Sequence, residues 1–268
     1  MKTNFHKMHG LGNDFVIIDA RTVPVDMPVP RAAAIANRRT GIGCDQLILL
    51  ESSTVASVKM RIFNADGGEV EACGNATRCV ALLMDGSATI ETMAGILHTE
   101  LGDAQAIVTF GQPAFDWELI PLAMPIDTMD MPVSWEELDH PMAVNVGNPH
   151  VIFFVDDVDA VPLEMLGPLI ENDPLFPERI NVNVAAITGP NSLKLRVWER
   201  GVGLTRACGT GACATAVAAI RSRRTASPVT VSLPGGKLIV DWSDGQPIKM
   251  SGPAAHVFSG EADWDTFG

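Results

Sequence analysis

The chain has 268 residues, enough for two modest domains or one large one around a buried core. Lysine and arginine total 19 against 32 acidic residues, and the resulting net charge of −13 disfavours binding to nucleic acid. The N-terminus lacks the apolar segment of a signal peptide, and no apolar run approaches the roughly 20 residues of a membrane-spanning helix. We therefore expect a cytoplasmic protein with no membrane or nucleic-acid partner.

The first half of the chain opens with three segments that recur later: GNDFVII (12–18), GIGCDQLILL (41–50) and VKMRIFNADGGEVEACGN (58–75). The small-residue stretch ATRCVALLMDG (76–86) then predicts a helix. Short alternating runs predict the strands that follow it: ATIET (88–92), ILHTEL (96–101) and AIVTF (106–110). A Pro- and Asp-rich stretch, Gln112 to Pro132, is the expected domain boundary.

The second half follows the same order, with GNPHVIF (147–153), FPERINVNVA (176–185) and LKLRVWERGVGLTRACGT (193–210). A predicted helix, TGACATAVAAI (210–220), comes next. Turn residues separate the predicted strands after it: VTVSL (229–233), KLIVDW (237–242) and PIKMS (247–251).

The two halves are an internal repeat. Segments 58–75 and 193–210 align without a gap and place Cys73 on Cys208, an offset of 208 − 73 = 135. The same offset places segment 12–18 on 147–153. The alternative is a chance resemblance between two βα units. Duplication instead predicts two similar α+β domains related by a pseudo-twofold axis, with a site in the cleft between them.

Equivalent positions of two such domains would face one ligand from opposite sides. The aligned pairs are mostly polar and lie beside apolar strand runs, where buried polar groups need partners. They are Asn13 with Asn148, Gln46 with Asn181, Asn64 with Glu199, and Cys73 with Cys208. These pairs predict a site for a polar substrate.

Cys73 and Cys208 each precede a predicted helix start. The positive end of a helix dipole favours a thiolate, and the free N–H groups that follow would bind a carboxylate. No motif for pyridoxal phosphate, flavin or nucleotide is present, so no cofactor is expected. One thiolate and one thiol on opposite faces of a carbon could invert its configuration. The alternative is that these cysteines only pack, which is expected for Cys44, Cys79 and Cys213.

A zinc site is the other use for these cysteines. It would recruit Cys73, Cys79, Cys208 and Cys213, with His150 as a further ligand. The pairs are separated by five and four residues, which are not the usual intervals of zinc motifs. The five cysteines are also odd in number and widely spread, which indicates thiols in a reducing compartment. We expect no metal.

Several specific motifs resemble the diaminopimelate epimerase family along nearly the whole chain. They are FHKMHGLGNDF (5–15), GIGCDQL (41–47), NADGGEVEACGN (64–75), GNPH (147–150), ERINV (178–182) and ERGVGLTRACGTGACA (199–214). Related proline-racemase-like enzymes carry Cys-Gly-His where this chain has Cys73-Gly74-Asn75. The resemblance implies interconversion of LL- and meso-diaminopimelate, in lysine and peptidoglycan precursor biosynthesis.

The resemblance also implies a fold and a set of site residues. Each domain would be a mixed sheet wrapped around a central helix, with domains at 1–115, completed by 257–268, and at 116–256. Cys73 and Cys208 would be the catalytic acid and base, with His150 and Glu199 beside them. The residues implied to bind substrate are Asn13, Gln46, Asn64, Gly74, Asn75, Asn148, Asn181, Arg200, Gly209 and Thr210. Arg200 suits the distal carboxylate.

The chain departs from the family pattern in two respects. Ala76 and Thr77 follow Asn75 where a Gly and an aliphatic residue are common, and their small size would preserve the carboxylate site. The chain has no Tyr, so any dimer contact made by that side chain in relatives is absent; a homodimer is still expected.

Three alternatives remain at this point. An epimerase or racemase for another amino acid would share the two thiols but not the distal-carboxylate contact. A thiol redox protein would form a Cys73–Cys208 disulfide and gain activity on oxidation. A non-catalytic member of the fold is the third, and the presence of both thiols argues against it.

Overall fold

The computed structural model describes residues 2–71, 73–102 and 105–267. The chain divides into two compact units. Unit 1 comprises Met1–Val108 and Gly252–Gly268, and unit 2 comprises Thr109–Ser251. The stretch 112–132, where a boundary was expected, lies in unit 2 and contributes Ile120, Leu122 and Met131 to its core. Among the described residues, no helix has the length and apolarity needed to span a membrane.

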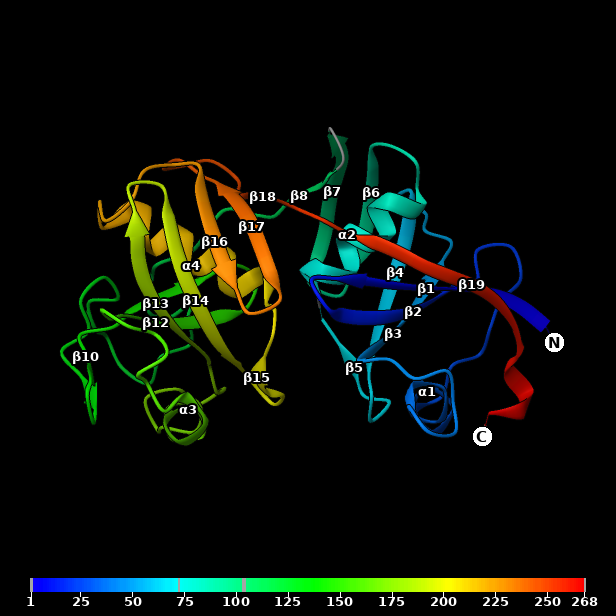
Figure 1. Cartoon of the computed structure of the whole chain (residues 1–268), viewed down its shortest axis with the longest axis horizontal. Helices are drawn as coiled ribbons and strands as arrows, with labels where there is room; N and C mark the ends of the chain where they lie inside the picture. The colour runs from blue at the N-terminus through cyan, green and yellow to red at the C-terminus, as the bar shows by residue number, and fades with distance from the viewer. Residues whose placement is uncertain (1, 72, 103–104, 268) are drawn as a thin grey trace. The chain divides into compact units, whose positions relative to one another are not determined.

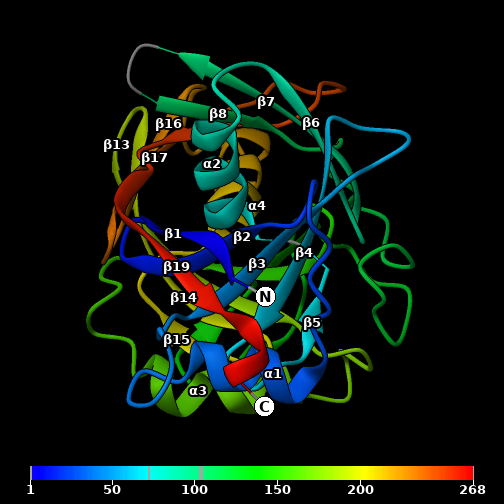
Figure 2. The same cartoon turned by 90° about the vertical axis from the view of Figure 1, so that its right-hand side faces the viewer.

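Unit 1 is a mixed sheet with two α-helices. Its helices are α1 (Val29–Ala36), α2 (Gly74–Leu83) and a terminal 3-10 turn (Trp264–Thr266). Its strands are β1 (Lys2–Gly10), β2 (Asn13–Asp19), β3 (Gln46–Glu51), β4 (Val58–Asn64), β5 (Glu69–Val70), β6 (Ala88–Thr92), β7 (Gly95–Gly102), β8 (Gln105–Thr109) at the junction, and β19 (Ala255–Asp263). The late strand β19 pairs antiparallel with β1, beside which it runs in Figure 2.

Unit 2 has the same plan. Its helices are α3 (Leu163–Glu171) and α4 (Gly209–Arg221). Its strands are β9 (Ser134–Trp135), β10 (Leu138–Asp139), β11 (Met142–Asn145), β12 (Pro149–Phe154), β13 (Asn181–Gly189), β14 (Ser192–Glu199), β15 (Gly203–Thr205), β16 (Val229–Leu233), β17 (Gly236–Asp241) and β18 (Lys249–Gly252). In Figure 1, strands β14, β16 and β17 pass across α4.

The strand pairings repeat between the units. In unit 1, β1/β2 is antiparallel, β2/β3 parallel, β3/β4 antiparallel, β4/β6 parallel and β6/β7 antiparallel. Unit 2 repeats this order of antiparallel and parallel pairs in β11/β12, β12/β13, β13/β14, β14/β16 and β16/β17. Phe15 pairs with Gln46 and His150 pairs with Asn181, so both members shift by 135 positions. The α+β class and the duplicated mixed sheet are therefore confirmed.

Helices α2 and α4 are the buried centres of their units. Residues Gly209–Ala219 of α4 are buried, and α4 contacts β11, β12, β13, β14, β16 and β17. An α-helix that is apolar on all sides is stable only inside a core. The sequence GTGACATAVAAIR suits this position, because alanine favours helix and small side chains let strands approach closely. The predicted helices after Cys73 and Cys208 are confirmed.

Candidate active site

In unit 1, Cys73 is the N-cap of α2. Its backbone is extended and its Sγ accepts the N–H of Ala76 at 3.5 Å. The next residues, Gly74 and Asn75, form the buried first turn of the helix. The N–H groups of a first turn have no partner within their helix and attract anions. The predicted placement of a thiol at a helix start is confirmed.

A tight turn brings Asn13 to this helix start. The turn joins β1 to β2 through Leu11 and Gly12, both at positive φ (58° and 87°), as in a two-residue hairpin. The Oδ1 atom of Asn13 accepts the Nδ2 of Asn75 at 3.1 Å and lies 3.8 Å from the Sγ of Cys73. Asn75 Oδ1 in turn accepts the buried guanidinium of Arg78 at 2.9 Å. Asn13 and Asn75 thus meet beside the thiol.

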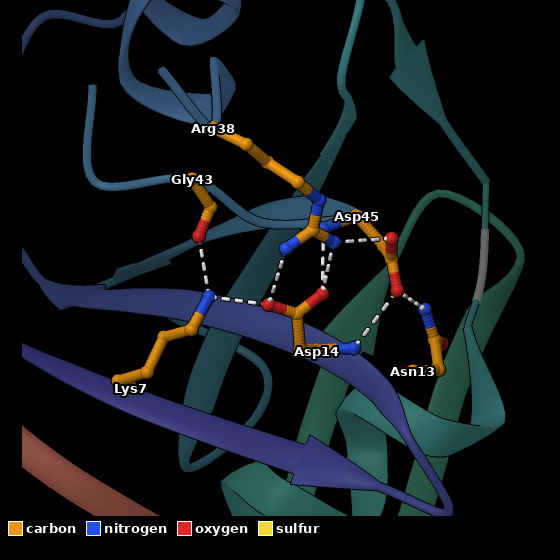
Figure 3. Close-up of polar contacts among 6 residues, drawn as sticks. All are labelled: Lys7, Asn13, Asp14, Arg38, Gly43 and Asp45. Atoms are coloured by element: carbon orange, nitrogen blue, oxygen red, sulfur yellow. Dashed lines mark hydrogen bonds and ion pairs between the residues drawn. The ribbon is translucent and has the colours of Figure 1, made fainter. Parts of the chain in front are cut away.

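An ionic network holds Asn13 from the other side (Figure 3). Asp45 Oδ2 accepts the Nδ2 of Asn13 at 3.2 Å and the backbone N–H of Asp14 at 3.0 Å. The Nη2 of Arg38 bridges the two carboxylates, at 2.5 Å from Asp14 and 2.6 Å from Asp45, and Lys7 also contacts Asp14. Hydrogen bonds from Arg38 and Lys7 outweigh burial and lower the pKa of Asp14. The network therefore restricts the orientation of the Asn13 amide.

Gln46 and Asn64 lie opposite each other on β3 and β4. The Nε2 of Gln46 donates to the Oδ1 of Asn64 at 2.9 Å, while the buried Oε1 of Gln46 has no hydrogen-bond partner among the residues that the structure describes. Buried polar atoms of this kind usually have a partner, so Gln46 has an acceptor available to a ligand. Asn64 is half-buried.

In unit 2, Cys208 is the N-cap of α4. Its Sγ accepts the N–H of Gly211 at 3.3 Å and lies 3.5 Å from the Oγ1 of Thr210. Gly209 and Thr210 form the buried first turn. The local geometry therefore reproduces that of Cys73 in unit 1, as the alignment predicts.

His150 lies beside this helix start, completely buried on β12. Its Nε2 is 3.0 Å from the Oδ1 of Asn148, and the Nδ2 of Asn148 donates to the Oγ1 of Thr210 at 3.3 Å. Burial, assisted by the charge of Arg200, lowers the pKa of His150 to about 3. The imidazole is therefore neutral at physiological pH.

The stability of the protein should consequently fall in mild acid. Because the folded pKa of His150 is about 3 and its ordinary pKa is 6.5, the unfolded chain binds the extra proton between these values. Stability from this group is complete above about pH 6.5 and is lost as pH falls; by pH 5 the loss is about 2 kcal/mol. Urea unfolding at about pH 7 and 5 measures it, with His150→Gln as the control variant. Equal pH dependence in both proteins would contradict the assignment.

Glu199 ends β14 close to Cys208. Burial raises the pKa of its carboxyl group, against hydrogen bonds with Thr205 and Cys208 that lower it. The hydroxyl of Thr205 donates to Glu199 Oε1 at 2.5 Å. A half-buried carboxyl group with a raised pKa beside a thiol is suited to proton transfer.

Asn181 and Arg200 lie on the same side of unit 2. Asn181 is buried, donates to Pro149 O at 2.8 Å and accepts the backbone N–H of Arg200 at 3.0 Å. The Arg200 side chain is half-buried, and its Nη1 donates to the Glu178 carbonyl at 3.1 Å. The structure thus brings together the unit 2 residues selected from the sequence: Asn148, His150, Asn181, Glu199, Arg200, Cys208, Gly209 and Thr210.

The other cysteines are packed thiols, as predicted: Cys44, Cys79 and Cys213 are buried. Burial raises the pKa of Cys44 to about 11 and that of Cys79 to about 12. Cys73 is the most exposed of the five. Among the described residues, no group of three or more His, Cys, Asp or Glu has metal-site geometry.

Iodoacetamide at about pH 8 should therefore modify Cys73 well before Cys44 or Cys79, because the thiolate is the nucleophile and these two thiols remain protonated. Peptide mass spectrometry over a time course measures the order. A Cys73→Ala variant identifies the fast site. Modification of Cys44 or Cys79 at the rate of Cys73 in folded protein would contradict this prediction.

Several residues of the site were not selected from the sequence. Asp45 accepts a hydrogen bond from Asn13 and is itself paired with Arg38, and Arg78 donates to Asn75. Asn183 contacts His150 and lies two residues after Asn181 on β13. Because residues two apart on a strand share a face, the repeated Asn in INVNV was the available signal for Asn183.

The fold of this chain is similar to that of several solved structures. A Bacillus anthracis phenazine biosynthesis protein of the PhzF family matches 98% of this chain and 99% of its own, with a TM-score of 0.71 and 19% identity. An Agrobacterium vitis hydroxyproline epimerase with bound trans-4-hydroxy-L-proline matches 97% of this chain and 91% of its own (TM-score 0.69, 15% identity). At these identities the likeness concerns the fold.

The sequence comparisons are more specific. The family model for diaminopimelate epimerase matches residues 5–115 and 142–257. The diaminopimelate epimerase of Sphingopyxis alaskensis is 69% identical over 268 residues, covering all of both chains. That of Zymomonas mobilis is 56% identical, also over the full length of both. The chain belongs to the diaminopimelate epimerase family, whose members are isomerases acting on amino acids.

Proposed function

We propose that the chain interconverts LL- and meso-diaminopimelate without a cofactor, using Cys73 and Cys208 as acid and base. The observation that supports this most directly is the duplicated helix start. Each cysteine is the N-cap of a buried helix at equivalent positions of a repeated unit, and each Sγ accepts a backbone N–H from the helix's first turn.

The proposed reaction begins with one thiolate and one thiol. The thiolate sulfur removes the α-proton from one face, and the thiol on the other face donates its proton to the same carbon. The product has the inverted configuration, and the two cysteines have exchanged protonation states. The reverse reaction starts from that state, so no net proton is gained or lost.

Both helix starts would bind the α-carboxylate. First-turn N–H groups at Gly74, Asn75, Gly209 and Thr210 are the proposed donors. They would stabilise the negative charge that develops as the α-proton leaves, which a cofactor would otherwise delocalise. Asn13, Gln46, Asn64, Asn148 and Asn181 would position the remaining polar groups.

Neutral His150 and the half-buried carboxyl of Glu199 would set the protonation of the thiols and hold the α-amino group. Arg200 would pair with the distal carboxylate. We further propose that the protein is a homodimer, which light scattering tests. We also propose that it is cytoplasmic, because a reducing compartment keeps both thiols available.

The test is incubation of the reduced protein with LL-diaminopimelate in deuterated water, with no added cofactor. The expected product is meso-diaminopimelate carrying one solvent deuterium at the inverted α-carbon. Mass spectrometry measures the deuterium, and chiral chromatography measures the configuration. Proline and glutamate serve as control substrates and should be unchanged. Turnover of a control substrate but not of diaminopimelate would favour an epimerase for another amino acid. Activity that appears only after oxidation would favour the redox alternative.

A further inference from the structure

We infer that Asn183 is a positioning residue that holds His150 as its Nε2–H tautomer and thereby directs a chain of hydrogen-bond donors onto the sulfur of Cys208. The inference rests on the proposed function, since Cys208 is there the acid or base. The hydrogen-bonded series consists of five residues, all in unit 2: Asn183, His150, Asn148, Thr210 and Cys208.

The orientation of the Asn183 amide follows from its contacts. Its Nδ2 lies 3.1 Å from the carbonyl oxygen of Val151 and 3.0 Å from the Nδ1 of His150. A backbone carbonyl only accepts hydrogen bonds, so the group facing it must be the NH2. The second hydrogen of this NH2 points to Nδ1 of His150. Nδ1 therefore carries no proton and acts as an acceptor.

The tautomer of His150 then determines the direction of every later bond. A neutral imidazole with an accepting Nδ1 has its proton on Nε2, which donates to the Oδ1 of Asn148 at 3.0 Å. Asn148 must then present its Nδ2 to the Oγ1 of Thr210, at 3.3 Å. With its oxygen accepting that bond, the hydroxyl of Thr210 is directed to the Sγ of Cys208 at 3.5 Å.

The result is two donors from the first turn of α4 on one sulfur. The Gly211 N–H and the Thr210 O–H both point to the Sγ of Cys208. Donors of this kind stabilise negative charge on sulfur more than they stabilise a thiol. Reversal of the His150 tautomer would make Asn148 rotate its amide and turn the Thr210 hydroxyl away from Cys208.

The packing around Asn183 also indicates that an amide side chain is required at this position. Asn183 is completely buried, and within the described part of the chain its Oδ1 has no hydrogen-bond partner. A Cβ atom added at Gly211 would lie 2.8 Å from this Oδ1, so the glycine makes room for the amide against the first turn of α4. A half-satisfied buried amide costs free energy that an apolar side chain would avoid. Its donor contact with His150 accounts for its presence.

The test reads the tautomer directly. In protein labelled with 15N at histidine, long-range 1H–15N spectra distinguish Nδ1–H, Nε2–H and imidazolium forms, and His150→Gln identifies the His150 signals among the six histidines. The wild type should show Nε2–H without substrate. Asn183→Asp presents only acceptors, so Nδ1 should become protonated. The same charge change at exposed Asn4, Asn4→Asp, should leave the tautomer unchanged.

Activity provides the second readout. Asn183→Asp and the similarly sized Asn183→Leu should each lower kcat by about tenfold or more, with little change in KM, because the altered group acts on sulfur in the transition state. If neither variant folds, the wild-type spectrum alone carries the test. A wild-type Nδ1–H tautomer, an unchanged tautomer in Asn183→Asp, or full kcat in Asn183→Leu would overturn the inference.

These outcomes separate the inference from the proposed function. A wild-type protein that epimerises diaminopimelate while Asn183→Leu keeps full activity contradicts only the role of Asn183. A wild-type protein with the Nε2–H tautomer that inverts no amino acid contradicts the proposed function and leaves the hydrogen-bond geometry intact.

Discussion

Cys73→Ala and Cys208→Ala should each lower the rate of epimerisation by about 10³-fold or more, because each removes one of the two proton carriers. The pattern of deuterium incorporation should distinguish these variants from proteins that are simply inactive. With one thiol left, the enzyme can still remove and return a proton on one face. Each variant should therefore exchange the α-hydrogen of only one configuration for deuterium, and return the substrate without inversion.

Matched variants make this result specific. Cys79→Ala and Cys213→Ala change buried cysteines in the same two helices and should keep the wild-type rate, apart from a loss of stability. Inversion by either active-site variant at a rate close to that of wild type would exclude the two-base mechanism. Exchange of both configurations by a single-cysteine variant would indicate one mobile base in place of two fixed ones.

Arg200→Met should raise the KM for diaminopimelate by about 10²-fold, the effect of losing roughly 2–3 kcal/mol of charge-assisted hydrogen bonding to the distal carboxylate. Methionine keeps much of the length of the side chain and removes its charge. The kcat value should change much less, because the distal carboxylate takes no part in bond making or breaking. Initial rates over a range of substrate concentrations measure both constants.

Two controls show whether the loss comes from the distal contact. Arg223→Met removes an exposed arginine of unit 2 and should leave KM unchanged. An analogue of diaminopimelate that lacks the distal carboxylate should bind the wild type and Arg200→Met equally. If the variant weakened both ligands to the same extent, Arg200 would act through the structure of its turn, where its N–H donates to Asn181.

The features predictable from the sequence were those that the duplication repeats. Cys73 and Cys208 both cap helices, and the strand pair Phe15/Gln46 recurs as His150/Asn181. Periodicity also predicted the paired runs after each helix, which became β6, β7, β16 and β17. Two copies under the same packing constraints provide an internal check that a single pattern lacks.

The features that the sequence did not predict lie outside the repeat or depend on side-chain contacts. Helix α1 begins without a side-chain cap and has only eight residues, and α3 contains Pro168, which disfavours a helix interior. Both are stabilised by tertiary packing, which local propensity does not contain. The contact of Arg38 with Asp14 joins residues 24 positions apart and depends on how the loop before β3 folds back.

Because strand β19 comes from the end of the chain, the two units can complete their folding at different times during synthesis on the ribosome. Unit 2 is one continuous segment and is complete once Ser251 has emerged. Unit 1 begins with β1, whose pairing with β19 runs from Lys2 to His9 and requires residues 255–263. Until then, one edge of β1 exposes unpaired N–H and C=O groups, which favour aggregation. The part of the protein translated first is thus the last to complete its fold, and chaperone binding to nascent chains should concentrate on unit 1.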